Sequence, residues 1–171
     1  YTSYTPYQAE ISQGRLEALI NFQTMVADLT NLDIANASLL DEPTAAAEAM
    51  TLAHRSSKSK SDTFLVDKNC FPQTVSIVKA RAKPLGINVE VVDLKNFDAN
   101  EAFGALFQYP GNDGSIDVST EMLAPLKDKG IITIAATDLL ALTLIKAPGD
   151  LGFDIATVSY THLRAHETSN H

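Results

Sequence analysis

Short apolar segments alternate with helical segments along most of this chain, and this alternation constrains its fold more than any other feature. Apolar runs bounded by polar or turn residues predict four strands, at residues 63–67, 88–93, 105–109 and 131–136. Helices are predicted between them at 72–83 and from the capping residue Ser119 to Lys129, where Gly130 ends the helix. Strands that alternate with helices of this size are typical of βαβ connections. We therefore predict an α/β architecture, a mostly parallel sheet with flanking helices.

Two further helices are predicted before the first strand. Apolar residues at i, i+3 and i+4 spacing give the first helix one mostly apolar face, along Leu16, Leu19, Ile20, Val26 and Leu29. Either Asp41 or Glu42 caps the second helix, with Pro43 at its first position and the helix-forming run 44–53 behind it. The polar stretch 55–62 is then a surface connection.

The composition is that of an ordinary globular domain and excludes several classes of partner. The chain has 171 residues, of which 45% are hydrophobic and 20% charged, which is enough for one core. A formal net charge of −8 argues against binding to nucleic acid or to an anionic membrane, because both select clustered Lys and Arg. The single cysteine, Cys70, cannot form an internal disulfide, which fits a reducing compartment. No apolar run reaches the roughly 18 residues of a membrane span, and no signal peptide is recognised.

The first residues of the chain are dense in tyrosine. Tyr1, Tyr4 and Tyr7 fall within seven residues, just before the first predicted helix. A tyrosine combines a large apolar ring with a hydroxyl that needs a hydrogen bond when buried, so such a cluster favours an interface or the mouth of a pocket. A loop packed ahead of the helix is the alternative.

Three long stretches of this chain resemble one protein family. They are YTSYTPYQAEISQG at residues 1–14, LDIANASLLDEPTAAAEAM at 32–50 and FLVDKNCFPQTVSIVKARAKPLGINVEVVD at 64–93. Together they are similar to the amino-terminal half of the glycine decarboxylases, the P-protein family of the glycine cleavage system. The similarity continues to about Ile155.

The resemblance implies a fold, an activity and partners. The fold is part of the large domain of the pyridoxal-phosphate-dependent aspartate aminotransferase fold, truncated here. The activity is that of a glycine dehydrogenase (aminomethyl-transferring), which decarboxylates glycine with pyridoxal phosphate and passes the aminomethyl group to the lipoyl group of the H-protein. The implied partners are glycine, the lipoylated H-protein and a catalytic carboxy-terminal half or subunit. They assemble as a homodimer or heterotetramer in the cytoplasm, or in the mitochondrion of a eukaryote.

For this chain itself the resemblance leaves alternatives open. Residues 1–157 correspond to the cofactor-free amino-terminal half, which in the family lacks the lysine that holds the cofactor. The fragment alone is therefore expected to be inactive and to bind no cofactor. A noncatalytic structural subunit that supports the catalytic half is the alternative to an enzyme fragment. A small ligand-binding α/β domain without any link to glycine cleavage is a third possibility, on fold alone.

Three places fall at strand ends or helix starts, where α/β sheets bind ligands. Asp41–Ala47 starts the second helix, but its two carboxylates and its proline favour a helix cap over a phosphate cradle. Asn69–Pro72 follows the first strand and lacks the histidine that stacks on the cofactor in the catalytic half of the family, so Phe71 is assigned to packing. Asp138 resembles the aspartate that pairs with the pyridinium nitrogen, and it is the one cofactor-binding candidate. Its alternative role is to cap a helix at 139–144.

No catalytic residue is predicted within the chain. The Schiff-base lysine of the family follows a later strand of the sheet, and Lys146 is assigned to the solvated surface. Tyr4, Thr5, Tyr7 and Gln8 are predicted to face the catalytic partner or to wall its active site.

Residues 158–171 are predicted to be a non-native tail. The stretch VSYTHLRAHET, from Val158 to Thr168, resembles a translated transposase sequencing adapter. The tail has no period-two apolar face and is expected to be disordered. Three of the four histidines, His162, His166 and His171, lie in it. No metal site is predicted, because imidazole ligands need neighbouring groups that fix their orientation.

Overall fold

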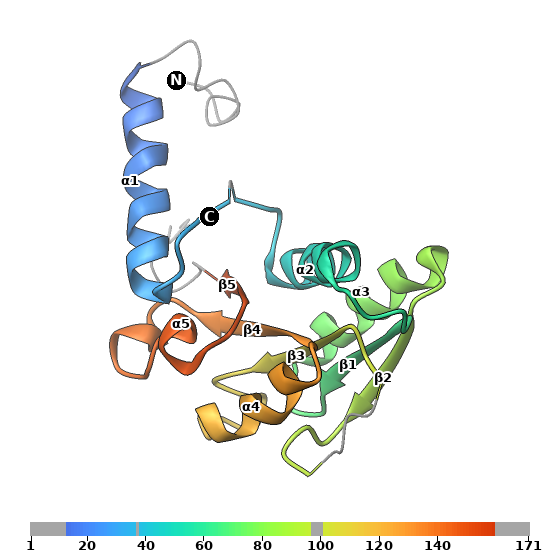
Figure 1. Ribbon diagram of the computed structural model, residues 1–171. Helices are drawn as coiled ribbons and strands as arrows, with labels where there is room; N and C mark the ends of the chain where they lie inside the picture. The colour runs from blue at the N-terminus through green and yellow to red at the C-terminus, as the bar shows by residue number, and fades with distance from the viewer. Residues whose placement is uncertain (1–12, 37, 97–100, 160–171) are drawn as a thin grey trace, which may run out of the picture.

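The strands of this protein run parallel in one five-stranded sheet, in the order β2-β1-β3-β4-β5 (Figure 1). The computed structural model describes residues 13–36, 38–96 and 101–159. Within them the strands are β1 (Thr63–Asp67), β2 (Asn88–Val92), β3 (Gly104–Gln108), β4 (Ile132–Asp138) and β5 (Ile155–Ser159).

Helices cover both faces of the sheet, as Figure 1 shows. They are α1 (Gln13–Thr30), α2 (Glu42–Ser56), α3 (Pro72–Ala82), α4 (Thr120–Asp128) and α5 (Pro148–Leu151), with the 3₁₀ turns η3 (Lys83–Leu85) and η4 (Ala141–Thr143). The helices α2 and α3 lie on one face, and α4 and α5 lie on the other. Among the described residues, no helix is long and apolar enough to cross a bilayer.

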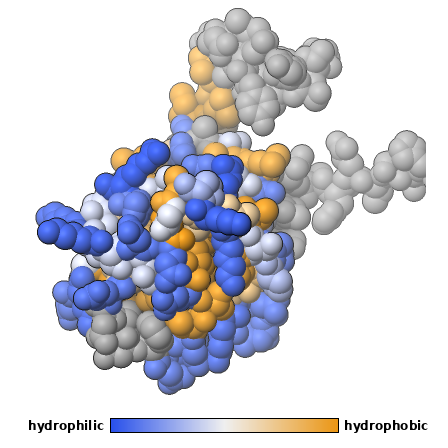
Figure 2. All heavy atoms as spheres, turned by 90° about the vertical axis from the view of Figure 1, so that its right-hand side faces the viewer, coloured by the Kyte–Doolittle hydropathy of each residue, from blue (hydrophilic) through white to orange (hydrophobic). Residues whose placement is uncertain are grey.

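Each strand sends alternate side chains into two separate cores. Phe64, Val66 and Leu106 pack with α2 and α3, whereas Leu65 and Phe107 pack with α4 and α5. All five residues of β3 are buried, which is the pattern of a strand covered on both faces. The edge strand β2 is more open. Figure 2 looks onto this side, where apolar atoms lie within a hydrophilic surround. Val91 of β2 is 42% exposed.

The predicted strands and helices agree closely with the structure. The strand predicted at 63–67 is β1 without change, and the other three differ from β2, β3 and β4 by one or two residues at an end. Ser119 and Lys129 are the cap residues of α4, and Gly130 has a φ of 72°, as its role in ending the helix requires. The α/β fold class is therefore confirmed.

Three details differ from the predictions. Asp41 is the cap of α2, so Pro43 stands at the second helical position rather than the first. The expected helix at 139–144 is only the 3₁₀ turn η4. The fifth strand, β5, is formed, and Val158 and Ser159 pair with Thr137 and Asp138 of β4. Pairing alone does not test the division into residues 1–157 and 158–171, which stays a prediction, and residues 160–171 lie outside the described part.

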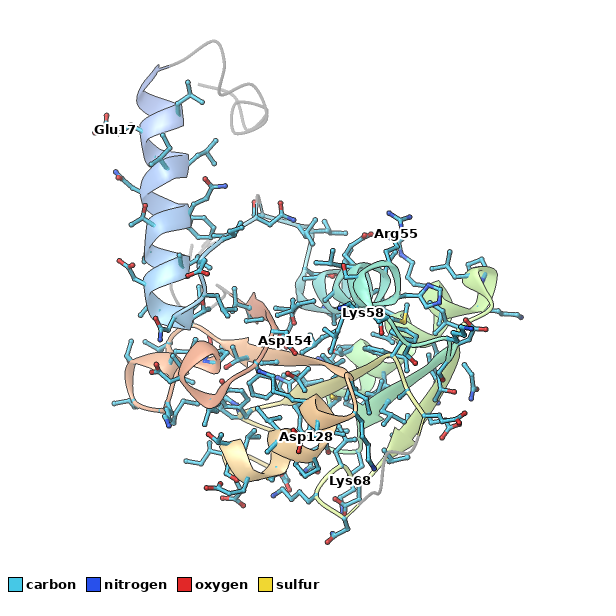
Figure 3. The ribbon with its side chains drawn as sticks, in the orientation of Figure 1. Glu17, Arg55, Lys58, Lys68, Asp128 and Asp154 are labelled. Atoms are coloured by element: carbon cyan, nitrogen blue, oxygen red, sulfur yellow. The ribbon has the colours of Figure 1, made fainter. Side chains whose placement is uncertain are left out.

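The long helix α1 stands away from the body of the fold (Figure 1). Its last turns carry Val26 and Leu29 against the core, but Leu16, Ile20 and Met25 are exposed. Glu17 points away from the rest of the molecule (Figure 3). The apolar face predicted for this helix is therefore only partly covered by the described residues.

The residue after α1, Asn31, lies very close to the backbone of α5 at Gly149. Asn31 follows the helix with a φ of 50°, and its amide donates to Asp150 Oδ1 at 2.6 Å. Gly149 lies beneath it, and a Cβ at this position would overlap the carbonyl of Asn31. Only glycine allows α5 to come this near.

We predict that Gly149→Ala destabilises the fold by about 1–3 kcal/mol, because the added methyl group meets backbone that must move. Urea unfolding followed by circular dichroism measures the change. Gly14→Ala is the matched control, since nothing lies within 4 Å of a Cβ at that helical position. The prediction fails if the two variants have the same midpoint.

Candidate functional site

The carboxyl ends of the strands meet at one edge of the sheet, because all of the strands run in parallel. The chain leaves β1 through α3 on one face, and it leaves the neighbouring strand β3 through α4 on the other face. Where neighbouring strands diverge in this way, α/β proteins bind ligands beyond the strand ends. Functional side chains are therefore expected in the loops after β1, β3 and β4 and in the first turns of α2 and α3.

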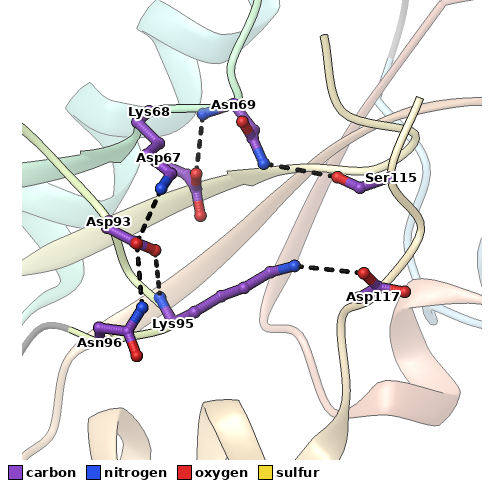
Figure 4. A network of polar contacts seen from close by, with 8 residues as sticks. All are labelled: Asp67, Lys68, Asn69, Asp93, Lys95, Asn96, Ser115 and Asp117. Carbon is purple, nitrogen blue, oxygen red and sulfur yellow. Dashed lines mark hydrogen bonds and ion pairs between the residues drawn. The ribbon is translucent and has the colours of Figure 1, made fainter. Parts of the chain in front are cut away.

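A polar network ties the loop after β1 to the loop after β3 (Figure 4). The buried Asp67 carboxylate accepts a hydrogen bond from the backbone N–H of Asn69 at 2.8 Å. The Asn69 carbonyl accepts from the backbone N–H of Asn112 at 2.8 Å, and its side-chain amide donates to Ser115 Oγ at 3.4 Å. Burial raises the pKa of the Asp67 carboxyl, while the hydrogen bond from Asn69 lowers it. The network holds both loops in place.

Two lysines lie at this edge, and both are engaged with carboxylates (Figure 4). Lys68 Nζ lies 2.8 Å from Asp93 Oδ2, and Lys95 Nζ lies 3.4 Å from Asp117 Oδ2. The hydrogen bond that the Lys68 ammonium donates to Asp93 raises the pKa of this ammonium. A raised pKa keeps this amine protonated, whereas a nucleophilic lysine needs a lowered one.

Cys70 lies at the start of α3 with its side chain in the core. It is 3% exposed, and its thiol faces the carbonyl of Leu106 at 3.8 Å. Burial raises the pKa of the thiol most, and the charge of Asp67 raises it further. A buried thiol with a raised pKa is unreactive, so Cys70 is a packing residue. Phe71 beside it is half-buried at the cap position of α3.

Asp41, the residue just before α2, caps this helix. The Asp41 carboxylate accepts a hydrogen bond from the backbone N–H of Thr44 at 2.8 Å. Hydrogen bonds from Thr44 hold the pKa of Asp41 below its ordinary value. Of the two roles weighed for this segment, the structure shows the helix cap, because the carboxylate takes up an N–H that a phosphate would otherwise use.

Glu42, the next residue, turns its carboxyl group inward. Its Oε1 is buried without a hydrogen-bond partner among the described residues. The pKa of the Glu42 carboxyl is raised, mainly because the group is buried. A hydrogen bond with the Gln108 side chain partly offsets this increase, whereas the negative charges of Asp138 and Asp41 add to it. Gln108 ends β3 and is 5% exposed, and its own Oε1 also lacks a partner within the described part.

Asp138 ends β4 at the same edge. Its Oδ1 accepts from the backbone N–H of Leu140 at 3.4 Å, so the carboxylate closes the turn before η4 rather than capping a long helix. Its charge acts on Glu42. Whether Asp138 contacts a cofactor is not tested by this geometry and stays a prediction.

The three places selected from the sequence are brought together. Glu42 lies within electrostatic range of both Asp138 and Cys70, so the first turns of α2 and α3 and the end of β4 share one edge. Gln108 was not among the residues predicted from the sequence, although a glutamine that ends the apolar run Gly104–Phe107 was a usable signal. Tyr4, Thr5, Tyr7 and Gln8 lie outside the described residues.

A metal site was not predicted, and the three tail histidines are also outside the described part. Within residues 13–36, 38–96 and 101–159, no group of three or more His, Cys, Asp or Glu side chains is placed to hold a metal ion.

Relatives of this chain are named for glycine metabolism. The family described as "Glycine cleavage system P-protein" matches residues 1–163. Glycine dehydrogenase (decarboxylating) of Jannaschia sp. (strain CCS1) is 58% identical over 159 residues, which is 93% of this chain. The chain spans only 17% of that relative's length.

Solved structures agree with the sequence comparison. The crystal structure of an inhibitor-bound glycine decarboxylase (P-protein) of the glycine cleavage system matches 99% of this chain and 40% of its own chain, with a TM-score of 0.84 and 30% identity. An O-acetylhomoserine (thiol)-lyase of Campylobacter jejuni, described with N'-pyridoxyl-lysine-5'-monophosphate, covers 80% of this chain and 34% of its own. Its TM-score of 0.61 at 17% identity shows a shared fold. By sequence and by fold, this chain therefore belongs to the glycine cleavage system P-protein family.

Proposed function

We propose that residues 1–157 are part of the amino-terminal, cofactor-free half of a glycine decarboxylase, with residues 158–171 a non-native tail. In the complete enzyme this half supports the catalytic carboxy-terminal half and walls its active site. Glycine loses its carboxyl group as CO₂, and its aminomethyl group passes to the lipoyl group of the H-protein. The names of the relatives support this activity. For the complete enzyme we propose a homodimer or a heterotetramer.

The observation that carries the proposal is the chemistry at the start of α2. Pyridoxal phosphate brings a phosphate group, which binds where backbone N–H groups are uncompensated. Here Asp41 takes up one N–H group with a charge that opposes an anion, and Glu42 adds a second carboxyl group. Lys68 and Lys95 are both paired with carboxylates. These residues do not fit the cofactor, so we place pyridoxal phosphate on the remainder of the complete enzyme.

A hybrid enzyme tests the proposed activity. Residues 1–157 replace the matching segment of the Jannaschia enzyme, and release of CO₂ from carboxyl-labelled glycine is measured with lipoylated H-protein present. We expect the hybrid to retain activity within about tenfold, since the two segments are 58% identical. The isolated chain is expected to show none. An assembled hybrid that contains pyridoxal phosphate but releases no CO₂ would contradict the proposal.

The isolated chain is predicted not to form a covalent adduct with pyridoxal phosphate, because the described edge offers no free, low-pKa lysine beside an anion site. The chain is incubated with the cofactor and reduced with borohydride, and adducts are mapped by mass spectrometry. Scattered, substoichiometric labelling of exposed lysines is expected. One stoichiometric pyridoxyl-lysine at a single position would show that the chain holds its own cofactor.

Tyr4 and Tyr7 are predicted to be interface anchors toward the catalytic half. Replacing both by Ala in the hybrid enzyme should weaken its assembly or turnover, since truncating an aromatic anchor typically costs about 2 kcal/mol or more. Glu17→Ala is the control, because Glu17 points away from the rest of the molecule (Figure 3). Unchanged turnover and assembly in the double variant would remove these tyrosines from the interface.

A further inference from the structure

Glu42 and Gln108 bring two buried, unpaired oxygen atoms to the carboxyl edge of the sheet. Glu42 starts α2, and Gln108 ends β3 and is 5% exposed. Oε1 of each side chain is buried without a hydrogen-bond partner among the described residues. The two side chains nevertheless share a hydrogen bond. Because neither Oε1 takes part in it, this bond runs from the Gln108 amide N–H to the other carboxyl oxygen of Glu42.

The two remaining oxygens can pair only if one of them carries a hydrogen. A carboxylate oxygen and an amide carbonyl oxygen are both acceptors, so an ionised Glu42 cannot donate to Gln108. A carboxylic acid has one O–H donor. With that hydrogen, each side chain donates one hydrogen bond and accepts one. Buried polar atoms in folded proteins are nearly always paired, which favours this cyclic arrangement.

The charges that face Glu42 favour the neutral acid as well. Asp41 on the same segment and Asp138 at the end of β4 act on its carboxyl group, and both are negative. Cys70, before α3, has a raised thiol pKa and brings no positive charge. Among the described residues, no lysine or arginine acts on this carboxyl. The amino end of α2 attracts anions, but Asp41 already accepts the N–H of Thr44 there.

We propose that Glu42 is a neutral carboxylic acid in the folded protein and donates its proton to Oε1 of Gln108. This acid–amide pair holds the first turn of α2 against the end of β3 and depends on one proton. Loss of the proton leaves two facing acceptors and adds a third negative charge beside Asp41 and Asp138. The pair does not depend on glycine decarboxylation, since none of its groups is assigned to that chemistry.

An ionised Glu42 with a buried water molecule is the competing arrangement. A water molecule has two O–H donors, so it could donate to Oε1 of Glu42 and to Oε1 of Gln108. The two arrangements differ in the charge of Glu42. A measurement of its protonation state therefore separates them.

The first experiment measures this protonation state in the parent chain and needs no variant. The side-chain carboxyl carbon of Glu42 is followed by ¹³C NMR as the pH is raised, with N-acetyl-glutamate amide as the free reference, which titrates at about 4.3. We expect Glu42 to hold its proton at neutral pH. A Glu42 carboxyl that titrates together with the free reference would overturn the proposal and favour the bridging water.

The second experiment uses the linkage between this proton and folding. In the unfolded chain Glu42 loses its proton near the ordinary pKa of about 4.3, whereas the folded chain keeps it to a higher pH. The unfolded state then binds fewer protons than the folded state, so the stability of the parent falls as the pH rises from about 4.3 through the folded pKa. Urea unfolding midpoints at a series of pH values measure this fall.

Glu42→Gln should remove this contribution to the pH dependence. An amide has the shape of the neutral acid and donates an N–H to Oε1 of Gln108 at every pH. Glu48→Gln is the matched control on the same helix, because Glu48 is exposed and lies 3.8 Å from Arg81. This control should retain the pH dependence of the parent chain. The proposal is overturned if the two variants respond alike to pH, or if Glu42→Gln has a lower midpoint than the parent at neutral pH.

Discussion

Two-sided burial of a parallel sheet is the constraint on which the rest of this structure depends. Because helices cover both faces, a strand such as β3 has no solvated face on which to place a polar residue. On the three central strands β1, β3 and β4, the charged and amide side chains therefore stand at the carboxyl ends, as Asp67, Gln108 and Asp138. The same constraint directs the first turns of α2 and α3 to this edge. The concentration of buried polar groups there follows from the layering before any function is considered.

The strands were predictable because their signals are local. A continuous apolar run bounded by turn residues, such as Phe64–Val66 between Thr63 and Asp67, specifies a buried strand without reference to the rest of the chain. The helix considered at 139–144 does not form, for a non-local reason. Asp138 pairs with Ser159 across the sheet, and the last residues of β4 are held extended through that position, which leaves room only for η4. Tertiary pairing here outweighs local helix preference.

The candidate site was predictable in its parts but not in its connections. Asp41–Ala47, Asn69–Pro72 and Asp138 could be chosen because each follows a strand or starts a helix. That Glu42 meets Gln108, sixty-six positions later in the chain, depends on the strand order and on which face β3 turns toward α2. No periodic pattern in the sequence predicts this contact between the Glu42 and Gln108 side chains. The cap role of Asp41 was recognised because Asp before a helix has a short-range hydrogen-bonding partner, here the N–H of Thr44.

The electrostatics at the start of α2 explain why the described residues do not fit the phosphate group of the cofactor. The amino end of a helix attracts anions through its free N–H groups and its dipole. In this chain Asp41 satisfies that attraction internally, and Glu42 adds a second carboxyl group with a buried oxygen. The start of α2 thereby lacks a free N–H group that a phosphate would need. Because Asp41 occupies the helix end, Glu42→Gln alone should not create a phosphate site.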